Sequence, residues 1–514
     1  MASQQQKKDG LLELLPRDKL SKRQKELHRA LLNGYTPTYR FLREPTRLDE
    51  FDWENYRYHA IWRENETFIC VIYGPYWGPE IRGRNVFFQL DNVGKVNLNC
   101  VIYGTNDAAI AETMSFFWSL KHPEHAQAAL RISACIHLPD FEAKCKFDFA
   151  CLQADQLIQI LEANPRRQLQ FEPGTWTPEQ AVILASRSFP MHLIMAGDIQ
   201  WDDYSKDDGG YLIETIANRQ SSFGSLSLDL SRGNNTFIDR AFTEELIKLD
   251  LLEKLTLGIL NEELGLLPFS AKAKALNYTI THSAMQPNDF DSLDIAMKRI
   301  HLSISSFRQD DDAGVLFVAF FLRIAQLGHF EHLGISLKER GMMNDTESVV
   351  QALIHAINNN PRLTHLALGD LGVLFSQGPH SDAIFHSFEK HEALRVINLE
   401  PYIPNILDGM TEDEYGHFCK PYYAALERLL SRNRNLVVLD STDEKISNGT
   451  TIEKLYALNH FYSGSEKLIQ ESDEVRHLLV GRVLTERAFA NFQYLGLLLS
   501  IYTDLLFEMV DGTS

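Results

Sequence analysis

Four histidines recur at one place in a repeated pattern, directly before an apolar residue that is followed two positions later by another. They are His192, His301, His332 and His365, and the last three fall in consecutive repeats. If the pattern is a β-strand, alternation places all four rings on one face. Parallel strands lie about 4.8 Å apart, so neighbouring imidazoles could couple their titrations. Metal binding and pH sensing are the chemical alternatives, but we favour neutral packing because no carboxylate in these strands orients the rings.

Small and weakly polar residues occupy the next positions on the same face. They include Ser227, Ser303, Ser336 and Asn398. These residue types indicate an open, shallow surface edged by the imidazoles. Because a binding surface needs a contiguous patch, we predict that these four residues and the four histidines form one.

Other residues with catalytic or ligand chemistry do not assemble into a site. The sequence has no glycine-rich phosphate loop, no G-x-S-x-G elbow and no H-E-x-x-H motif. The stretch "YSKDDGGYLIET" resembles a calcium loop around Gly209, yet Tyr204 and Lys206 stand where carboxylates are needed. His122 and His125 have the spacing of a ligand pair but no third ligand nearby. We therefore predict no catalytic residue, no metal and no cofactor.

The charge balance limits the partners. Fifty basic and 69 acidic side chains give a net charge of −19, which repels a nucleic-acid backbone. Residues 1–30 are locally basic and are expected to form a short solvated helix. The longest apolar runs, "GVLFVAFFL" and "LGLLLSIY", are too short to span a membrane. The six cysteines are dispersed, which is typical of a reducing compartment, so we expect an intracellular, cytoplasmic protein.

The histidine-bearing pattern belongs to a larger repeat. Eleven candidate strands follow one another from "KFDF" at residue 146 to "LVVLDST" at residue 436, at spacings of 22 to 42 residues. Amphipathic segments such as "SVVQALIHAINNN" lie between most of them, and Thr177 and Thr243 mark helix starts. A short strand that returns through a helix pairs in parallel with the next strand. The sequence therefore predicts an α/β solenoid with a curved parallel sheet inside and helices outside.

The pattern resembles the leucine-rich-repeat family, in its ribonuclease-inhibitor-like class, over residues 140–445. "LTHLALGDL" carries the Leu-x-x-Leu-x-Leu core at Leu363, Leu366 and Leu368, and "ALRVINLEPY" repeats it. The buried Asn or Cys that usually follows is replaced here by Leu371 and Tyr402. The uneven array also resembles uncharacterised, lineage-expanded leucine-rich-repeat proteins of unicellular algae. The resemblance implies protein binding on the concave sheet.

We expect four regions, which are a basic helical lead-in (1–50), an aromatic-rich N-terminal cap with irregular first repeats (51–140), the solenoid (140–445) and a helical C-terminal cap (446–514). The expected function is a non-enzymatic scaffold for a protein partner of unknown identity, with no membrane or nucleic-acid binding. Two alternatives stay open. One is a substrate-receptor subunit of a ligase complex, and the other is an enzyme with its site in the N-terminal region. The oligomeric state is not specified by the sequence.

Overall fold

The computed structural model describes residues 10–22, 24–25, 37–51, 58–72, 84–93, 96–121, 131–134, 147–171, 175–196, 200–201, 210–229, 240–306, 312–339, 343–369, 371, 373–376, 378–399 and 412–470. The chain divides into two compact units, Met1–Ala352 and Leu353–Ser514, and each is described by itself. Helix α8, Thr346–Asn358, contains the division. The continuity of one array over 140–445 therefore remains a prediction.

The first unit begins with mostly antiparallel strands. They are β1 (Leu12–Leu15), β2 (Thr38–Phe41), β3 (Tyr58–Trp62), β4 (Phe68–Ile72), β5 (Asn85–Val93) and β6 (Val96–Tyr103). β3 pairs with β4, β4 with β6 and β6 with β5, each time antiparallel, as the Gly- and Asn-interrupted aromatic sequence predicts. The helix expected in the basic lead-in is wrong for Leu12–Leu15, which pairs as a strand with β2, whereas Lys22, Gln24 and Lys25 are helical.

Aromatic side chains fill the core beside these strands. Helix α2, Asp107–Trp118, begins at the side-chain cap of Asn106 and buries Phe117 and Trp118 against Phe88. Further along, the ring of Phe149 stacks on Trp176 at 5.0 Å. The candidate strand "KFDF" is a wrong prediction, because the Asp148 carboxylate accepts from Ala150 N and starts a 3-10 turn, Phe149–Cys151. The alternating apolar residues there are aromatic anchors of a turn.

Eight parallel strands continue the first unit. They are β7 (Arg131–Ala134), β8 (Gln168–Phe171), β10 (Met191–Ala196), β12 (Gly224–Asp229), β13 (Leu252–Leu257), β14 (Ala275–Thr281), β15 (Arg299–Ser306) and β16 (His332–Glu339). Each pairs with the next in parallel. A minor parallel pair joins β9 (Thr175–Trp176) and β11 (Gln200–Trp201). The parallel sheet predicted from the repeat is thus confirmed.

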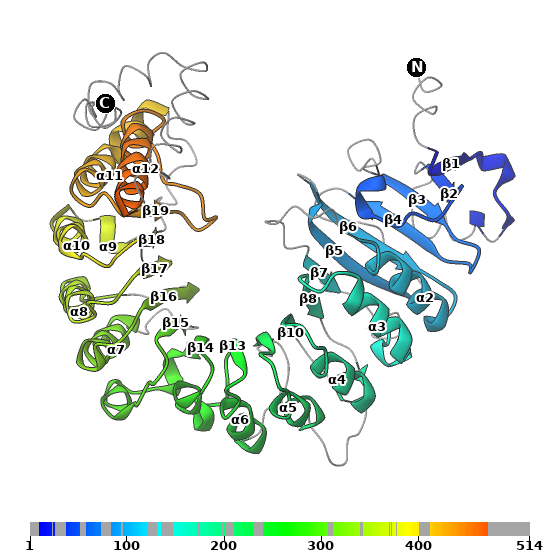
Figure 1. Ribbon diagram of the computed structural model, residues 1–514, viewed down its shortest axis with the longest axis horizontal. Helices are drawn as coiled ribbons and strands as arrows, with labels where there is room; N and C mark the ends of the chain where they lie inside the picture. Colours follow the sequence, from blue (N-terminus) through cyan, green and yellow to red (C-terminus); the bar gives the residue numbers. More distant parts are fainter. Residues whose placement is uncertain are drawn as a thin grey trace, which may run out of the picture. The chain divides into compact units, whose positions relative to one another are not determined.

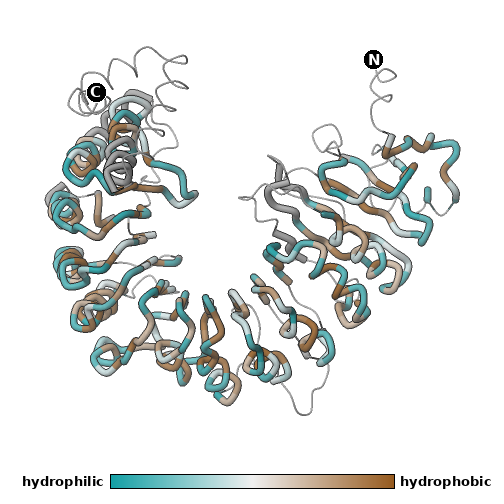
Figure 2. Tube along the Cα trace, in the orientation of Figure 1, coloured by the Kyte–Doolittle hydropathy of each residue, from teal (hydrophilic) through white to brown (hydrophobic). Residues whose placement is uncertain are grey.

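Helices connect most of these strands and lie on their outer side (Figure 1). They are α3 (Ala154–Ala163), α4 (Pro178–Ala185), α5 (Gly210–Ala217), α6 (Arg240–Ile247) and α7 (Ala313–Leu327). The start of α4 is as predicted, since Thr177 Oγ1 accepts from Gln180 N at 3.2 Å. The start predicted at Thr243 is wrong, because α6 already begins at Arg240 and Thr243 is buried within it. Hydrophobic and hydrophilic residues alternate along strands and helices (Figure 2), as burial of one face requires.

Two short repeats contain 3-10 turns in place of α-helices. Between β13 and β14 the chain forms η6 (Glu262–Leu264) and η7 (Leu267–Ser270), and between β14 and β15 it forms η8 (His282–Ala284) and η9 (Pro287–Ser292). Pro268 and Pro287 lie in the first turns of η7 and η9. The expectation of one helix per repeat is therefore wrong here. Length is not the reason, because the β8–β10 repeat has the same 24-residue register as the β14–β15 repeat and contains α4.

The second unit repeats the arrangement. Its elements are β17 (His365–Gly369), α9 (Val373–Ser376), α10 (Gly378–Lys390), β18 (Val396–Leu399), α11 (Glu412–Arg432), β19 (Val437–Leu439) and α12 (Thr451–Gln470). β17, β18 and β19 pair in parallel. Between α10 and α11 the carboxylate of Glu389 accepts from Arg428 at 3.2 Å and Arg432 at 2.7 Å. Helix α12 shows the predicted helicity as far as Gln470, and the role of this region as a cap stays a prediction. Residues 471–514 lie outside the described chain.

Polar side chains at the ends of helices bond to backbone of the preceding repeat. Asn164 donates to Leu120 O at 3.0 Å, His329 Nε2 to Met297 O at 3.3 Å and His391 Nε2 to Asn360 O at 3.0 Å. Asn433 donates to the carbonyls of Phe388 and His391. Arg219 does the same for Ala185 O at 2.5 Å. We call these contacts the inter-repeat bonds. They give side-chain donors to backbone carbonyls at the ends of helices and in the loops that follow them.

One glycine fixes the start of a strand. Gly224 has φ +96°, and a Cβ there would lie 2.2 Å from Met191 O. The register between β12 and β13 also shifts between Gly224 and Ser225. Because an L side chain fits neither the conformation nor the space, this position needs glycine.

Candidate functional site

The side chains of β10 and β12–β16 that alternate with the buried core residues form one surface, which we call the polar face. In β14, for example, Leu276, Tyr278 and Ile280 are buried, while the residues between them are partly exposed. The described side chains of the polar face are His192, Ile194, Ser225, Ser227, Lys254, Thr256, Ala275, Asn277, Thr279, Thr281, Arg299, His301, Ser303, Ser305, His332, Ser336 and Lys338, with Gly334 among them. Most are hydroxyl, amide or cationic residues.

The strand register corrects the predicted histidine ladder. His301 lies opposite Gly334, and His332 lies opposite Arg299. The prediction aligned Leu302 with Leu333, whereas the structure pairs Leu302 with Ile335. His332 is therefore displaced by two residues from His301 along the sheet. A ladder of neighbouring rings is wrong for this pair.

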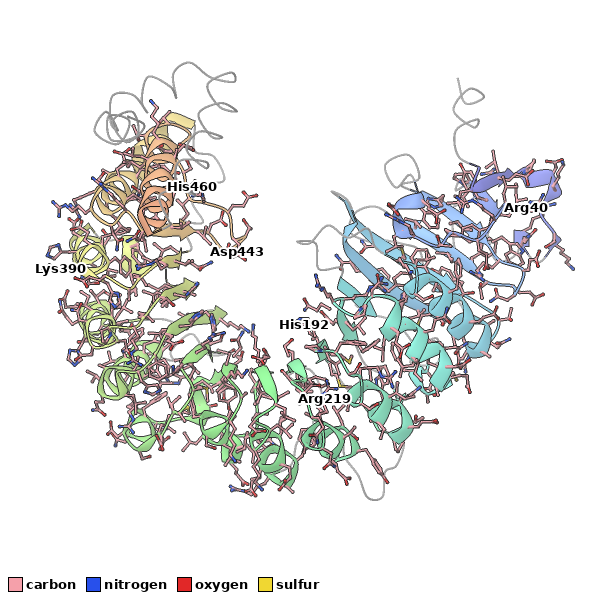
Figure 3. All side chains as sticks on the ribbon, viewed as in Figure 1. Arg40, His192, Arg219, Lys390, Asp443 and His460 are labelled. Atoms are coloured by element: carbon pink, nitrogen blue, oxygen red, sulfur yellow. The ribbon has the colours of Figure 1, made fainter. Side chains whose placement is uncertain are left out.

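The other predicted histidines lie apart. His192 is exposed on β10 (Figure 3), with Nδ1 2.9 Å from Ser225 Oγ. His365 belongs to the second unit, where it pairs with Val396 and its Nδ1 lies 2.8 Å from Thr364 Oγ1. These rings make separate local contacts, so each histidine must be considered by itself.

His301 fits into the space that Gly334 leaves open. A Cβ at position 334 would lie 2.1 Å from His301 Nδ1 and 2.6 Å from Cγ, so the ring crosses directly over the glycine backbone. Its Nε2 reaches Ser336 Oγ at 3.3 Å, and Ser336 Oγ lies 2.6 Å from Ser303 Oγ. Ser303 and Ser336 are 5% and 8% exposed. The predicted alignment set Ser303 beside Gly334, whereas the structure pairs Ser303 with Ser336. The two serines contact the imidazole and offer little surface to a partner.

Burial, together with the charges of Lys254 and Lys338, lowers the pKa of His301 to about 4. The imidazole is consequently neutral at pH 7. Both lysines are thus within electrostatic range of one ring, although they come from β13 and β16.

The ammonium groups of both lysines donate to side chains of β14. Lys254 Nζ donates to the amide oxygen of Asn277 at 3.0 Å, with the amide nitrogen donating to Leu276 O. Lys338 Nζ donates to Thr279 Oγ1 at 3.3 Å. Asn277 and Thr279 are alternate residues of β14. Partial burial lowers the pKa of Lys254 below its ordinary value.

The described polar face carries cations without carboxylates. Lys254, Arg299 and Lys338 are exposed, and no Asp or Glu is among its described side chains. Arg299 interacts electrostatically with Glu253 and Glu331, which lie at the border of the polar face. Within the described residues, neither lysine forms an ion pair. The sequence analysis missed these cations, because their convergence depends on the register of four strands.

Asn398 belongs to a different local structure in the second unit. Its amide donates to Asp443 Oδ1 at 2.9 Å. Asp443 has φ 61° in a turn that Asp440 Oδ1 holds by accepting from the backbone N of Thr442 and Glu444. Asn398 thus fixes a turn beside β18, and its predicted role in binding is not tested by this contact.

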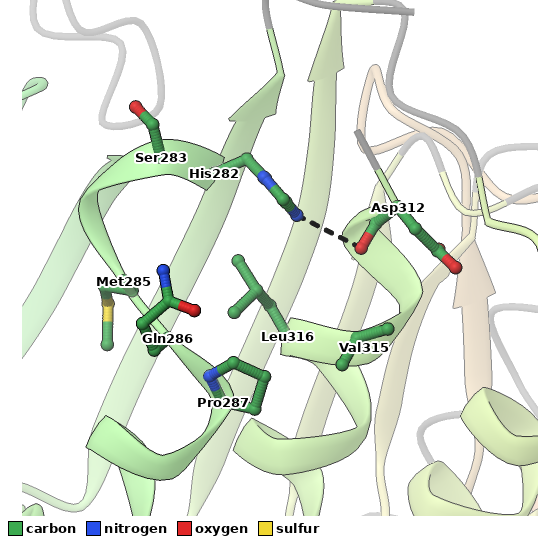
Figure 4. A pocket seen from close by; sticks show the side chains of 8 residues that line it. All are labelled: His282, Ser283, Met285, Gln286, Pro287, Asp312, Val315 and Leu316. Carbon is green, nitrogen blue, oxygen red and sulfur yellow. Dashed lines mark hydrogen bonds between the residues drawn. The ribbon is translucent and has the colours of Figure 1, made fainter. Parts of the chain in front are cut away.

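An open pocket of about 330 Å³ lies beside the end of β14 (Figure 4). Met285, Pro287, Val315 and Leu316 provide apolar walls. His282 Nε2 lies 3.2 Å from the backbone oxygen of Asp312, whose carboxylate accepts from Gly314 N at 2.9 Å. The carboxylate of Asp312 is therefore used as the N-cap of α7. We assign this pocket a structural role at the start of that helix.

Two of the described thiols, Cys70 and Cys100, are buried in the core. Burial raises the pKa of the Cys70 thiol to about 12 and also raises that of Cys100, so both are unreactive core residues. In the described ranges no group of three or more His, Cys, Asp or Glu side chains could hold a metal. The motifs at His122, His125 and Gly209 lie outside the described chain, as does "YGPYW" at 73–77.

The strand pairing and connecting helices define the class as a mixed α/β repeat fold with a parallel sheet, like a leucine-rich-repeat solenoid. No model of a known protein family matches the sequence, and no curated protein matches it. The chain is similar to one solved structure, titled as the leucine-rich repeat-containing protein LegL7 from Legionella pneumophila. The two share 14% identity over 59% of this chain and 76% of that one, with a TM-score of 0.24. A TM-score this low supports no argument about the fold, so the class of this chain is assigned from its own strand pairing.

Among the helices that the described residues form, none combines the length and apolar character needed to cross a bilayer.

Proposed function

We propose that the protein is a non-enzymatic scaffold that binds a protein partner on the polar face. The observation that carries the proposal is the set of accessible side chains on adjacent strands, such as Lys254, Thr256 and Thr279. A sheet of parallel strands presents many side chains side by side, which suits an extended protein surface.

The proposal keeps His192, Ser227, His301 and His332 as members of the surface and adds the cations. His365 and Asn398 are proposed members in the second unit. The ribonuclease-inhibitor-like class of repeat and the cytoplasmic location are parts of the same proposal. The dispersed cysteines of the sequence support the location, because such cysteines are typical of a reducing compartment.

Site-specific photo-crosslinking tests where a partner binds. A photoreactive amino acid is placed at Thr256 or Thr281 on the polar face, or at Val315 or Leu322, which are exposed on α7. The full-length variants are irradiated in lysate of the source cells. We expect the same polypeptide to be captured from both threonine positions and from neither α7 position.

The result should also depend on the imidazole. Replacing His301 by Ala in the Thr256 crosslinking variant should reduce capture, whereas replacing His386, which is exposed on α10, should not. Capture only from α7, or equal capture from both surfaces, would contradict the proposal.

A further inference from the structure

The polar face holds two ammonium groups that lack an anionic partner in the described chain. Lys254 and Lys338 come from β13 and β16, yet they donate to Asn277 and Thr279 of β14. Both acceptors are neutral oxygens. An ammonium that donates only to neutral oxygens can still gain a charge-assisted hydrogen bond from a carboxylate, which is stronger than a neutral one.

The two ammoniums bind acceptors whose spacing along β14 is that of alternate residues in an extended peptide. Their acceptors are alternate residues on one side of β14, and alternate residues of a strand are about 7 Å apart. Carboxylate side chains at alternate positions of an extended partner segment have the same separation. Arg299 lies in the same row of the sheet as Lys254 and adds a third cation at the border.

We propose that the polar face binds an acidic segment of the partner in extended conformation, with alternate carboxylates pairing with Lys254 and Lys338. This inference rests on the proposed function and specifies its partner. His301 lies between the two cations as a neutral ring and contributes hydrogen bonding and contact area. Ser303 and Ser336 hold that ring in place.

The surroundings of the lysines support an anionic ligand. Burial lowers the pKa of Lys254, and no carboxylate of the described polar face offsets this effect. A bound carboxylate would stabilise the charged ammonium. The net charge of −19 repels acidic peptides at long range, so binding to this protein requires local contacts.

Fluorescence polarisation with short synthetic peptides tests the inference. The probe is a labelled peptide of about eight residues in which Ser and Glu alternate, and the reference peptide has Gln in place of Glu. A third peptide has the same composition as the probe with its Glu residues consecutive. At about 20 mM salt, where surface charges are weakly screened, we expect the alternating acidic peptide to bind and the Gln peptide not to bind.

The variants compare equal charge changes at different places. Lys254→Gln combined with Lys338→Gln should weaken binding of the alternating peptide about tenfold. Lys272→Gln combined with Lys390→Gln is the matched control. Both of its lysines are exposed, and Lys390 lies on α10 (Figure 3). This control should leave the affinity within about twofold. If the first double variant melts at a lower temperature, the two single variants replace it.

Three results would overturn the inference. They are no binding of the alternating peptide by the wild type, equal losses in the two double variants, or tighter binding of a carboxylate-free phosphoserine peptide than of the probe. Equal affinity for the alternating and consecutive acidic peptides would show that binding does not depend on alternate carboxylates, and would contradict their pairing with Lys254 and Lys338. The crosslinking experiment separates this failure from that of the proposed function. If the peptide test fails but a partner is still captured from Thr256 and Thr281, the proposed scaffold function stands and the acidic partner segment is rejected.

Discussion

Lowering the pH should loosen the sheet around His301. The folded protein holds this imidazole neutral, with a pKa of about 4 caused first by burial and then by Lys254 and Lys338. In an unfolded or locally opened chain the pKa returns to about 6.5. The open state therefore binds more protons between these two values, and stability falls as the pH decreases through that window. At pH 7 the contribution of His301 is unaffected.

The size of the effect follows from the pKa difference. Each pH unit between the two values costs about 1.4 kcal/mol. At pH 5 the closed state of β15 and β16 should therefore lose about 2 kcal/mol relative to pH 7. That loss corresponds to about a thirtyfold decrease in hydrogen-exchange protection, because opening of the strands is what exposes the ring.

Hydrogen exchange of wild type and His301→Gln, read in peptides covering residues 299–306 and 332–339, measures the effect. The proteins are compared at the same pH, so that the intrinsic exchange rate cancels. His192→Gln is the matched control, because His192 is an exposed histidine of the same sheet. Equal protection ratios of wild type and His301→Gln at pH 7 and pH 5 would refute the reasoning.

Three further substitutions should change stability in defined ways. Gly334→Ala should cost about 2 kcal/mol by displacing the His301 ring, and a double-mutant cycle by thermal melting should show a smaller cost when His301 is Ala. Asn433→Ala removes the side-chain donor of His391 O, while Phe388 O keeps the backbone N of His391, and should cost about 2 kcal/mol in urea denaturation, against little change for the exposed control Lys454→Ala. Glu389→Gln should lower the melting temperature at pH 7. Burial raises the pKa of Glu389, but hydrogen bonds from Arg432, His386 and Arg428 outweigh this and lower it, so the difference should shrink as the pH falls below about 4.5. A difference that persists at low pH would contradict this assignment.

The strands could be predicted, but their register could not. Leu302 and Ile304 alternate with polar residues, which is sufficient to predict β15. In β16, however, Leu333, Ile335 and Leu337 are all buried, so two alignments with β15 keep every apolar residue inside. A slip of one residue would expose the core and is excluded by the pattern, whereas a slip of two is not. The placement of His332 depended on that choice.

The same limit explains the missed cations. Lys254 and Lys338 are 84 positions apart in the numbering and look like ordinary solvated residues in their own strands. Their ammoniums reach Asn277 and Thr279 only because β13, β14, β15 and β16 are successive neighbours in the sheet. The inter-repeat bonds were missed for a related reason. Asn164, His391 and Asn433 occupy loops before the strands, while the family pattern directs attention to the position after them.

The inter-repeat bonds give the array a direction. In each case the donor side chain belongs to the later repeat and the carbonyl to the earlier one. During synthesis on the ribosome, each newly emerged repeat that carries such a donor therefore completes the hydrogen bonds of a repeat that has already left the exit tunnel. The two ends of the array consequently differ. Truncation from the C-terminal side removes the donors that bond to carbonyls of the last remaining repeat. Truncation from the N-terminal side removes carbonyl acceptors and leaves their donors without a partner.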